Sequence, residues 1–475
     1  MTQAMMQLAQ AARIMNGVLL GADRPFYAVG TDSRTIADGQ LFFALKGENF
    51  DGEQYALQAL KQGAVAVVIT DENNPARPAI LVKSALLAMG ELASDWVQQW
   101  RSPRNKPVIA ITGSNGKTTT KEMLTAILIA ATGNQDKVHA THGNLNNHIG
   151  LPLTLLKLQP THEYAVIEMG MNHLLEIDYL THITKPNIAL INNAGTAHIG
   201  ELGSAENIAQ AKGEIFAGLA SDGIAVINED DRFADYWKSL NEKRKIITFG
   251  IKKSADVMAT YVEKAESSEI TLTTPTGRLS FMLKILGTHN ISNALAAAAS
   301  AVALNISNVH IEAGLSNFAG VSGRLQRKAG LNGAVLIDDT YNANPDSMKA
   351  AIDVLAGQAG NRILVLGAMG ELGARSAQMH YEIGVYAKSL GLKKLYCLNE
   401  VAGENTSELS VQMVHGFGAG AVLLCTPEQI VAELEGQLGA VTTVLIKGSR
   451  FMKMERVVQL LAVSSAHTDR NKGDS

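Results

Sequence analysis

Residues 107–120 of this chain read Pro-Val-Ile-Ala-Ile-Thr-Gly-Ser-Asn-Gly-Lys-Thr-Thr-Thr, and the predicted fold is organised around them. The run 108–111 is apolar and largely β-branched, which predicts a strand buried on both faces. A helical pattern of apolar residues begins shortly after Lys117. A strand, a glycine-rich turn, Lys-Thr and a helix form a triphosphate cradle, because backbone N–H groups and the helix N-terminus face the phosphates. The stretch therefore predicts a nucleotide site.

The spacing of this motif departs from that of the usual P-loop. The pattern G-x-x-x-x-G-K-[ST] needs a glycine six residues before the lysine, where this chain has Ile111. The shorter Thr-Gly-x-x-Gly-Lys-Thr of residues 112–118 remains, in which Lys117 would reach the β- and γ-phosphates and Thr118 would hold Mg²⁺. The alternative is an ordinary strand-to-helix turn with a solvated lysine. The flanking strand and helix favour the nucleotide site.

Composition limits the class of protein. The chain has 475 residues, of which 46% are apolar, so we expect about three domains, each with its own core. A net charge of −4 argues against a nucleic-acid-binding surface, and no apolar run approaches the ~18 residues of a membrane span. The N-terminus lacks the features of a signal peptide. Cys397 and Cys425 lie in apolar, strand-like runs, which predicts reduced core thiols in a cytoplasmic protein.

The order of predicted elements indicates an α/β protein of three domains, at residues 1–85, 86–313 and 314–475, with 464–475 as a frayed tail. Regular alternation of strands and helices in the second domain predicts a parallel, doubly wound sheet. Its strands are expected at 108–111, 164–167, 188–191, 224–227 and 245–249, with an antiparallel hairpin at the sheet edge within 256–286. A third α/β unit follows, with five strands predicted between residues 334 and 446.

Few residues outside the cradle can be assigned chemistry from the sequence alone. Glu168 follows the strand 164–167, and a carboxylate at the tip of a buried strand needs a cation or a donor, so Mg²⁺ is its expected partner. A loop-capping role is the alternative. Arg34, beside Ser33 in a turn, could bind a phosphate or could equally be solvated. Read alone, His198 resembles a structural loop histidine and Lys212 an exposed helix lysine.

Several further motifs follow one another along the chain. They are the cradle 112–118, Glu-Met-Gly at 168–170, Asn193 to His198, Ala-Lys-Gly-Glu at 211–214, Gly-Thr-His-Asn-Ile-Ser-Asn at 287–293, Gly323-Arg324, Asp-Asp-Thr-Tyr-Asn-Ala-Asn-Pro at 338–345 and Lys-Gly-Ser-Arg at 447–450. Together they resemble the Mur ligase family of cell-wall synthesis, in family order across all three predicted domains. Stretches 143–150 and 341–345 resemble the branch that adds a dipeptide.

The resemblance implies a role for each site residue. It implies an N-terminal UDP-muramoyl-binding domain, a central ATP-binding domain and a C-terminal Rossmann-like domain. ATP would be bound by Thr112, Gly113, Ser114, Asn115, Gly116, Lys117, Thr118, Thr119, Asn290, Asn293, Arg324 and Asp339. Two Mg²⁺ ions would be held by Thr118, Glu168, His198 and Lys212, the lysine as a carbamate. For His198 and Lys212 this role replaces the interpretation as a structural histidine and an exposed lysine. Substrate would contact Ser33, Arg34, Lys46, Gly47, Asn144, Asn146, Asn147, Tyr341, Asn342 and Asn344. The catalytic set would be Lys117, Lys212, His198 and Arg324.

The implied reaction joins D-alanyl-D-alanine to UDP-N-acetylmuramoyl-tripeptide through an acyl phosphate, in the synthesis of peptidoglycan precursors by a cytoplasmic monomer. Two other interpretations stay open. One is another amide ligase of the same build, either a diaminopimelate- or lysine-adding Mur ligase or folylpolyglutamate synthetase. The other is a nucleotide-operated binding switch that hydrolyses ATP without ligation.

Overall fold

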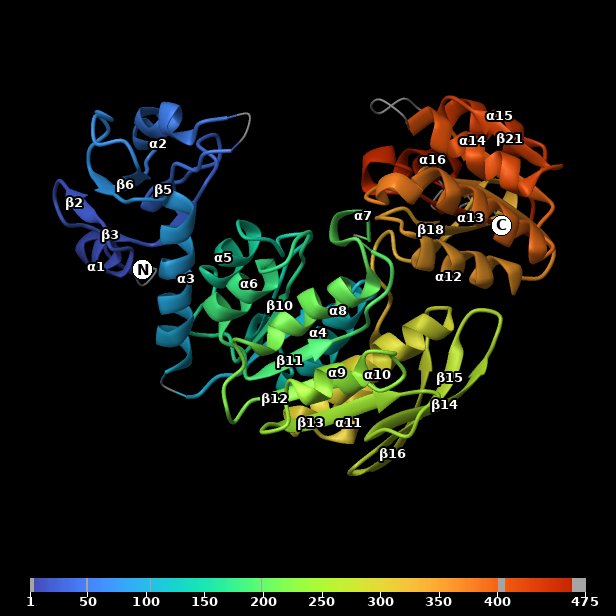
Figure 1. The fold of residues 1–475 in the computed structure, drawn as a ribbon, viewed down its shortest axis with the longest axis horizontal. Helices are drawn as coiled ribbons and strands as arrows, with labels where there is room; N and C mark the ends of the chain where they lie inside the picture. Colours follow the sequence, from blue (N-terminus) through green and yellow to red (C-terminus); the bar gives the residue numbers. More distant parts are fainter. Residues whose placement is uncertain (1–3, 48–49, 103, 198, 400–405, 464–475) are drawn as a thin grey trace, which may run out of the picture.

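The computed structural model describes residues 4–47, 50–102, 104–197, 199–399 and 406–463. It is an α/β structure in three units, each built on its own sheet (Figure 1), so the predicted fold class is confirmed. His198 and the predicted tail lie outside the described residues. No helix in the described part of the chain is long and apolar enough to cross a membrane.

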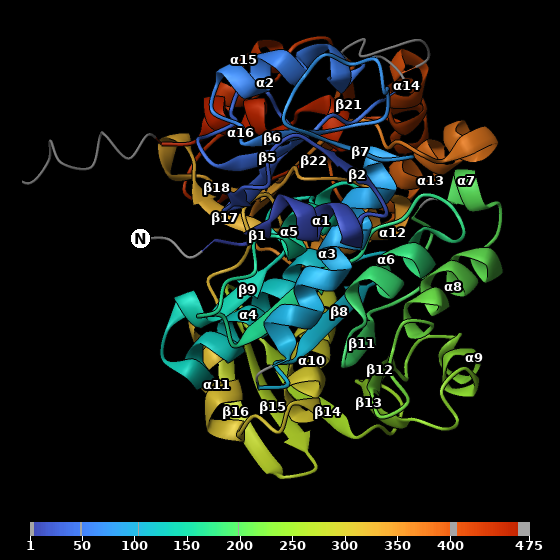
Figure 2. The ribbon, with the colours of Figure 1, turned by 90° about the vertical axis from the view of Figure 1, so that its left-hand side faces the viewer.

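The N-terminal unit contains a five-stranded sheet of order β2-β7-β6-β5-β4. Its strands are β2 (Val18–Leu20), β4 (Ala28–Gly30), β5 (Gln40–Phe43), β6 (Ala66–Ile69) and β7 (Ala79–Leu81), with helices α1 (Leu8–Ile14) and α2 (Ala56–Lys61). A separate short pair joins β1 (Met6–Gln7) to β3 (Pro25–Phe26). The long helix α3 (Ala85–Arg101) runs from this unit to the central one (Figure 2), where Trp96 and Trp100 donate to the carbonyls of Leu158 and Gln159.

The central unit contains a nine-stranded sheet of order β16-β15-β14-β13-β12-β11-β8-β10-β9. The parallel strands are β8 (Val108–Thr112), β9 (Val138–Ala140), β10 (Tyr164–Glu168), β11 (Ile188–Ile191), β12 (Ile224–Asn228), β13 (Lys245–Gly250) and, against β13, β14 (Val257–Glu263). The antiparallel edge is formed by β14, β15 (Ser268–Thr274) and β16 (Gly277–Leu283). Both the doubly wound sheet and its antiparallel edge were predicted from the sequence, and both are confirmed.

Both faces of this sheet are covered, which explains the continuous apolar runs of its strands. Ile109 packs in a core with α4 (Lys117–Thr132), α10 (Thr288–Ala303) and α11 (Asn308–Asn317). Ala110, the next residue, points into the opposite core with α5 (Gly150–Leu155), α6 (Glu176–Thr184) and α8 (Ala205–Gly213). The short helices α7 (Ile199–Leu202) and α9 (Ala234–Ser239) complete the unit. α11 crosses the predicted boundary at 313/314, and the domain limits stay a prediction.

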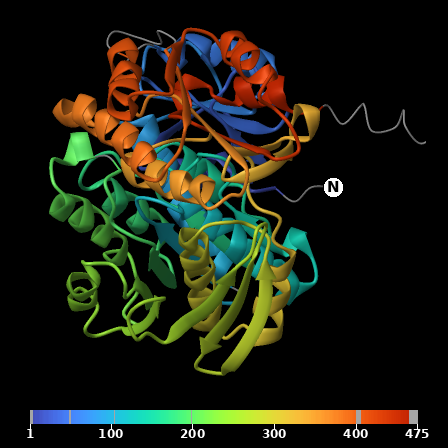
Figure 3. The same ribbon diagram turned by 90° about the vertical axis from the view of Figure 1, so that its right-hand side faces the viewer.

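The C-terminal unit is a six-stranded sheet of order β17-β18-β22-β19-β20-β21, and it lies above the central unit in Figure 3. Its strands are β17 (Gln326–Ala329), β18 (Val335–Asp339), β19 (Asn361–Leu366), β20 (Lys394–Leu398), β21 (Ala421–Leu424) and β22 (Thr442–Lys447), all parallel except β17. Helices α12 (Pro345–Ala356), α13 (Ser376–Ser389) and α14 (Thr406–Phe417) cover one face, and α15 (Pro427–Glu435) and α16 (Glu455–Leu461) the other.

Candidate active site

The predicted phosphate cradle lies at the carboxyl edge of the central sheet. Glu168 at the end of β10 pairs with Ile111 in β8, so these strand tips lie side by side where ligands bind in open α/β sheets. Gly116, with φ 79°, forms the N-cap of α4. A Cβ at Gly116 would lie only 2.1 Å from Asn293 Oδ1, so the backbone here approaches its neighbour more closely than a side chain allows.

A network of four asparagines is hydrogen-bonded to the cradle loop. Asn193 Oδ1 accepts from the N–H of Asn115 (2.9 Å), and Asn192 Nδ2 donates to the Asn115 carbonyl (2.9 Å). Asn192 Nδ2 also donates to Asn293 Oδ1 (2.8 Å), whose Nδ2 donates to Asn290 Oδ1 (3.0 Å). Sequence reasoning missed Asn192 as a cradle residue; its only signal was an amide directly after the apolar strand β11. The predicted nucleotide residue Asn293 therefore lies directly against the loop, and among the described residues Asn290 is hydrogen-bonded to the loop only through Asn293.

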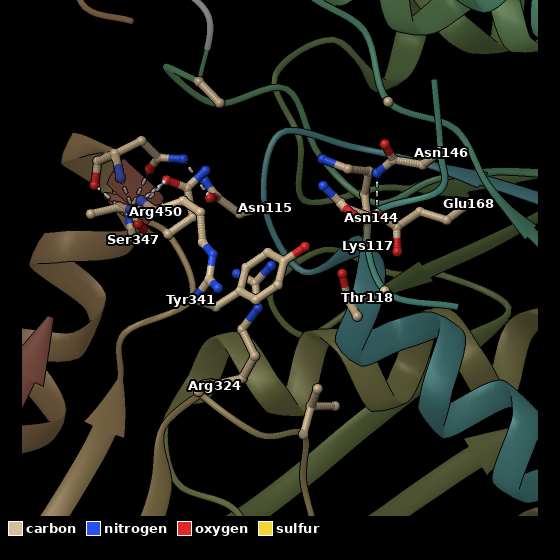
Figure 4. Close-up of a pocket in the computed structure, with 18 of the residues that line it drawn as sticks. Asn115, Lys117, Thr118, Asn144, Asn146, Glu168, Arg324, Tyr341, Ser347 and Arg450 are labelled. Atoms are coloured by element: carbon tan, nitrogen blue, oxygen red, sulfur yellow. Dashed lines mark hydrogen bonds between the residues drawn. The ribbon is translucent and has the colours of Figure 1, made fainter. Parts of the chain in front are cut away.

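A cavity of about 1140 Å³ opens beside the cradle, between the central and C-terminal units. Figure 4 shows Lys117, Thr118 and Glu168 on one side, with Arg324 and Tyr341 facing them from the other. The predicted residues that line it are Ser114, Asn115, Gly116, Lys117, Thr118, Asn144, Asn146, Asn147, Glu168, Arg324, Tyr341, Asn342 and Asn344. The fold thus brings together residues that lie more than 200 positions apart.

Glu168 has the surroundings of a cation ligand. The residue is 2% exposed, and its carboxylate Oε1 accepts from Asn146 Nδ2 (2.7 Å). Oε2 is buried and has no hydrogen-bond partner among the described residues. A buried carboxylate oxygen left without a donor is costly, and carboxylate and hydroxyl oxygens suit Mg²⁺. The described residues hold no cluster of three His, Cys, Asp or Glu, so a metal here needs further oxygen ligands, such as the Thr118 hydroxyl.

The charge of Lys117 acts on a second buried lysine, Lys212, which is not among the described residues that line the cavity. Lys117 Nζ donates to the Gly113 carbonyl (2.7 Å), and burial lowers the pKa of Lys117 while Glu168 opposes that change. Lys212 in α8 is 1% exposed, and burial, reinforced by the charge of Lys117, holds its pKa well below the ordinary lysine value. The interpretation of Lys212 as an exposed helix lysine is therefore wrong, because its helix turns this face into the protein.

Arg324 enters from the C-terminal unit. Its guanidinium lies 4.1 Å from the centre of the Tyr341 ring, a cation–π contact that fixes the side chain, and its Nε is buried without a partner in the described structure. Arg324 also contributes to the lowered pKa of Lys117, as expected for a second cation facing the same space.

Asp339 is placed differently from the cavity residues. Its Oδ2 accepts from Lys447 Nζ (2.6 Å), and its Oδ1 accepts from the N–H of Leu325 (3.1 Å). Lys447 is 1% exposed; burial lowers its pKa and the Asp339 carboxylate opposes this. A nucleotide contact for Asp339 stays a prediction, and the structure assigns this carboxylate a buried ion pair.

Asn344 and Asp346 connect the C-terminal unit directly to the cradle. Asn344 Oδ1 caps α12 by accepting from the N–H of Ser347 (2.9 Å), and its Nδ2 donates to Asn115 Oδ1 (2.8 Å). Asp346 Oδ2 accepts from both the N–H (2.6 Å) and the hydroxyl (2.9 Å) of Thr196. No local pattern singles out Asp346, because its partner lies 150 residues away. Substrate contacts by Asn344, and by its neighbour Asn342, stay predictions.

The loop of residues 141–149 carries the other predicted substrate residues. The backbone carbonyl of Asn146 accepts from the N–H of Gly170 (2.9 Å), and its side-chain amide donates to Glu168. Asn147 Oδ1 accepts from the N–H of Gly150 (2.8 Å) at the start of α5. Asn144, Asn146 and Asn147 all line the cavity, so the loop is tied down while its side chains remain at the cavity wall.

The predicted UDP-binding residues lie on the N-terminal unit. Arg34 is paired with Asp32 (2.7 Å) on an exposed turn, and the hydrogen bonds from Arg34 lower the pKa of Asp32 to about 2. Lys46 Nζ lies 3.5 Å from the carboxylate of Asp51. In the described structure neither these two cations nor their neighbours Ser33 and Gly47 line the cavity between the other units. Their role stays a prediction.

Three family models match the chain in succession. The Mur ligase family catalytic domain matches residues 25–97, the Mur ligase middle domain 111–314, and the Mur ligase glutamate ligase domain 323–450. The chain is 42% identical over 458 residues to UDP-N-acetylmuramoyl-tripeptide–D-alanyl-D-alanine ligase of Escherichia coli (strain K12), covering 96% of this chain and 98% of the relative.

Solved structures agree with these matches. A crystal structure of MurF from Acinetobacter baumannii superposes with a TM-score of 0.87 and 34% identity, covering 95% of this chain and 98% of that one. MurF ligase from Thermotoga maritima in complex with ADP gives a TM-score of 0.79 and 28% identity, covering 91% and 96%. Full-length similarity above 30% identity, three matched domains and the cavity geometry all agree: this chain belongs to the Mur ligase family.

Proposed function

We propose that this protein is an ATP-dependent amide ligase that joins D-alanyl-D-alanine to UDP-N-acetylmuramoyl-tripeptide, giving UDP-N-acetylmuramoyl-pentapeptide, ADP and phosphate. One observation carries the proposal. Lys117, the buried unpartnered oxygen of Glu168 and Arg324 face one cavity from two units. That arrangement suits phosphoryl transfer, in which positive groups stabilise charge on the transferring phosphoryl group. The Mur relatives described above carry this activity in their names.

A carboxylate is a poor electrophile at neutral pH, so the reaction needs an activated tripeptide. The terminal carboxylate of the tripeptide attacks the γ-phosphorus of ATP, and an acyl phosphate forms while ADP leaves. Lys117 and Arg324 would neutralise the charge that develops on the phosphoryl group, and exclusion of water from the cavity would strengthen that effect. Asn290 and Asn293 would hold the adenine side, and Asp339 would reach the ribose.

Mg²⁺ fits this site, with Thr118, Glu168, His198 and Lys212 as the proposed ligands. When bound, it would withdraw charge from the phosphate oxygens. We propose that Lys212 acts as a carbamate, because a protonated lysine has no lone pair and the nitrogen of a neutral amine is a poor ligand for Mg²⁺, which prefers oxygen. Burial favours the neutral amine, and the neutral amine is the form that adds carbon dioxide. The carbamate would supply an anionic oxygen ligand in addition to Glu168.

Ligation follows from the free amine of D-alanyl-D-alanine. The amine attacks the acyl carbon, and the tetrahedral intermediate expels phosphate as the amide forms. An acyl phosphate is readily hydrolysed, so the C-terminal unit must exclude water while it contributes Arg324. Catalysis then depends on the docking of that unit, a form of induced fit. Tyr341, Asn342 and Asn344 would lie near the dipeptide, and Asn144, Asn146 and Asn147 near the muramoyl peptide.

The N-terminal unit is proposed to hold the UDP end through Ser33, Arg34, Lys46 and Gly47. Arg34 would exchange its exposed pairing with Asp32 for the diphosphate. The enzyme is proposed to act in the cytoplasm as a monomer, in peptidoglycan precursor synthesis.

The decisive test is mass spectrometry of the products made from MgATP, UDP-N-acetylmuramoyl-tripeptide and D-alanyl-D-alanine. We expect the pentapeptide product, and ADP release that depends on the dipeptide and does not occur with single amino acids. ADP release with diaminopimelate, lysine or glutamate instead would identify another ligase of this build. ATP hydrolysis without any amide product would favour the nucleotide switch.

A further inference from the structure

Lys121 is a buried cation that the proposed mechanism does not use. It lies one helical turn after Lys117 in α4, so both lysines point from the same face of the helix. Lys121 is 1% exposed at the wall of the cavity, and its ammonium donates to the carbonyl of Thr141. The carboxylate of Glu122 lies 2.7 Å from Lys121 Nζ and balances its charge. Burial of an ammonium group costs free energy unless hydrogen bonds and a counter-charge compensate it. Lys121 therefore favours the one arrangement in which Thr141 and Glu122 both contact it.

Thr141 carries that arrangement into the active site. Besides accepting from Lys121, it donates its N–H to the Val166 carbonyl (3.0 Å), and its hydroxyl accepts from the N–H of Glu168 (2.9 Å). Thr141 is 1% exposed and begins the loop 141–149. One residue therefore joins the helix of the phosphate cradle, the strand tip that carries Glu168, and the loop predicted to contact the muramoyl peptide.

The chain of contacts continues on the cavity side. Glu168 Oε1 accepts from Asn146 Nδ2 (2.7 Å), and the Asn146 carbonyl accepts from the N–H of Gly170 (2.9 Å). Two contacts therefore set the position of Glu168. Thr141 holds its backbone N–H, and Asn146 holds one oxygen of its carboxylate, which orients the other oxygen. The position of Glu168 depends on where Thr141 lies, and Lys121 binds Thr141 to the helix.

We infer that Lys121 is a positioning residue that, through Thr141, sets the Glu168 carboxylate and the loop 141–149 in register with the phosphate cradle. The inference rests on the proposed function for the identity of the ligands, and it deepens that function. Lys117 and Lys121 are separated by one turn of a rigid helix. The phosphate cradle and the loop 141–149, which is predicted to contact the muramoyl peptide, therefore keep a fixed spacing. The reacting carboxylate and the γ-phosphate must meet at close range, and a small misplacement costs much of the rate.

The test uses the full-length protein and Mn²⁺ as the probe, with free Mn²⁺ measured by electron paramagnetic resonance in the presence of a non-hydrolysable ATP analogue. Lys121→Met keeps the length of the side chain and removes the donor. Thr141→Val keeps the shape and removes the hydroxyl that holds Glu168, whereas Thr141→Ser retains that hydroxyl. Lys264→Met, on the exposed hairpin where Lys264 pairs with Glu269, is the matched control.

Loss of a residue that orients a metal ligand typically costs on the order of tenfold or more in metal affinity. We expect Lys121→Met and Thr141→Val to weaken Mn²⁺ binding about tenfold, and Thr141→Ser and Lys264→Met to stay within twofold of wild type. If Lys121→Met does not fold, as judged by circular dichroism, the Thr141 pair decides. Wild-type affinity in a folded Lys121→Met or Thr141→Val protein would overturn the inference. Mn²⁺ binding needs no dipeptide acceptor, so failure of the proposed ligase reaction is scored separately by product formation.

Discussion

The buried ion pair between Lys447 and Asp339 allows a quantitative prediction for the C-terminal unit. The two side chains are 1% and 9% exposed and meet at 2.6 Å, and Lys447 also donates to the carbonyl of Asn342 (2.9 Å). Lys447→Met removes the cation and leaves the Asp339 carboxylate with the Leu325 N–H as its one hydrogen-bond donor among the described residues. Removing one partner of a buried pair costs about 3–5 kcal/mol, because the other charge stays buried without compensation.

The two cysteines of the chain provide the assay. Cys397 in β20 is fully buried, and burial raises the pKa of its thiol, so it reacts only when the C-terminal unit opens. Cys425 is exposed and would react at once, so the measurement is made on a Cys425→Ser background. With about 1.4 kcal/mol for each factor of ten, Lys447→Met should speed thiol labelling of Cys397 by roughly two to three and a half orders of magnitude.

Two further variants complete this experiment. Lys393→Met, at an exposed lysine of the same unit, should leave labelling of Cys397 within threefold of the background protein. Adding Asp339→Asn to Lys447→Met should reverse most of the acceleration, since the uncompensated charge is then gone. Acceleration of less than tenfold by Lys447→Met would refute the reasoning, because the pair would then contribute no more than an exposed one.

Three other predictions concern the active site. Lys212→Ala should abolish ligation, and short carboxylates such as acetate should restore part of the activity, whereas full activity without rescue would remove the carbamate. In carbon dioxide-free buffer, Lys212→Met should have a higher melting temperature than wild type at pH 7. Burial lowers the pKa of Lys212 in the folded protein, so the unfolded chain binds one more proton than the folded chain over this pH range. The stability of the wild type therefore rises with pH, and the difference in melting temperature should narrow as pH rises toward about 10.5. Asp346→Ala removes two hydrogen bonds that Thr196 donates to a carboxylate, each contributing about 1.5–3 kcal/mol. The C-terminal unit should then separate from the cradle and the radius of gyration should increase. An unchanged radius of gyration in X-ray scattering would contradict this prediction.

Local patterns predicted much of the fold. The apolar run 108–111 appears as β8, an interior strand of the nine-stranded sheet, and the hairpin expected within 256–286 appears as β15 and β16. These predictions succeeded because the side-chain period of a strand and the residues of a turn depend on neighbours in sequence. One prediction of the same kind failed. Cys425 was expected in the core with Cys397, yet it follows the end of β21 and is exposed, because an apolar run does not show where its strand leaves the sheet.

The amino-acid sequence by itself determined the class of fold, the position of the phosphate cradle and, through the order of its motifs, the family. The tertiary structure alone decided which charges are buried and what each one faces. Lys212 reads as a surface lysine until α8 is packed, Asp339 acquires Lys447 from 108 residues away, and Asp346 meets Thr196 across two units. Burial and pairing depend on segments that are remote along the chain, and the energy of a charge depends on both. No reading of local sequence can supply that information.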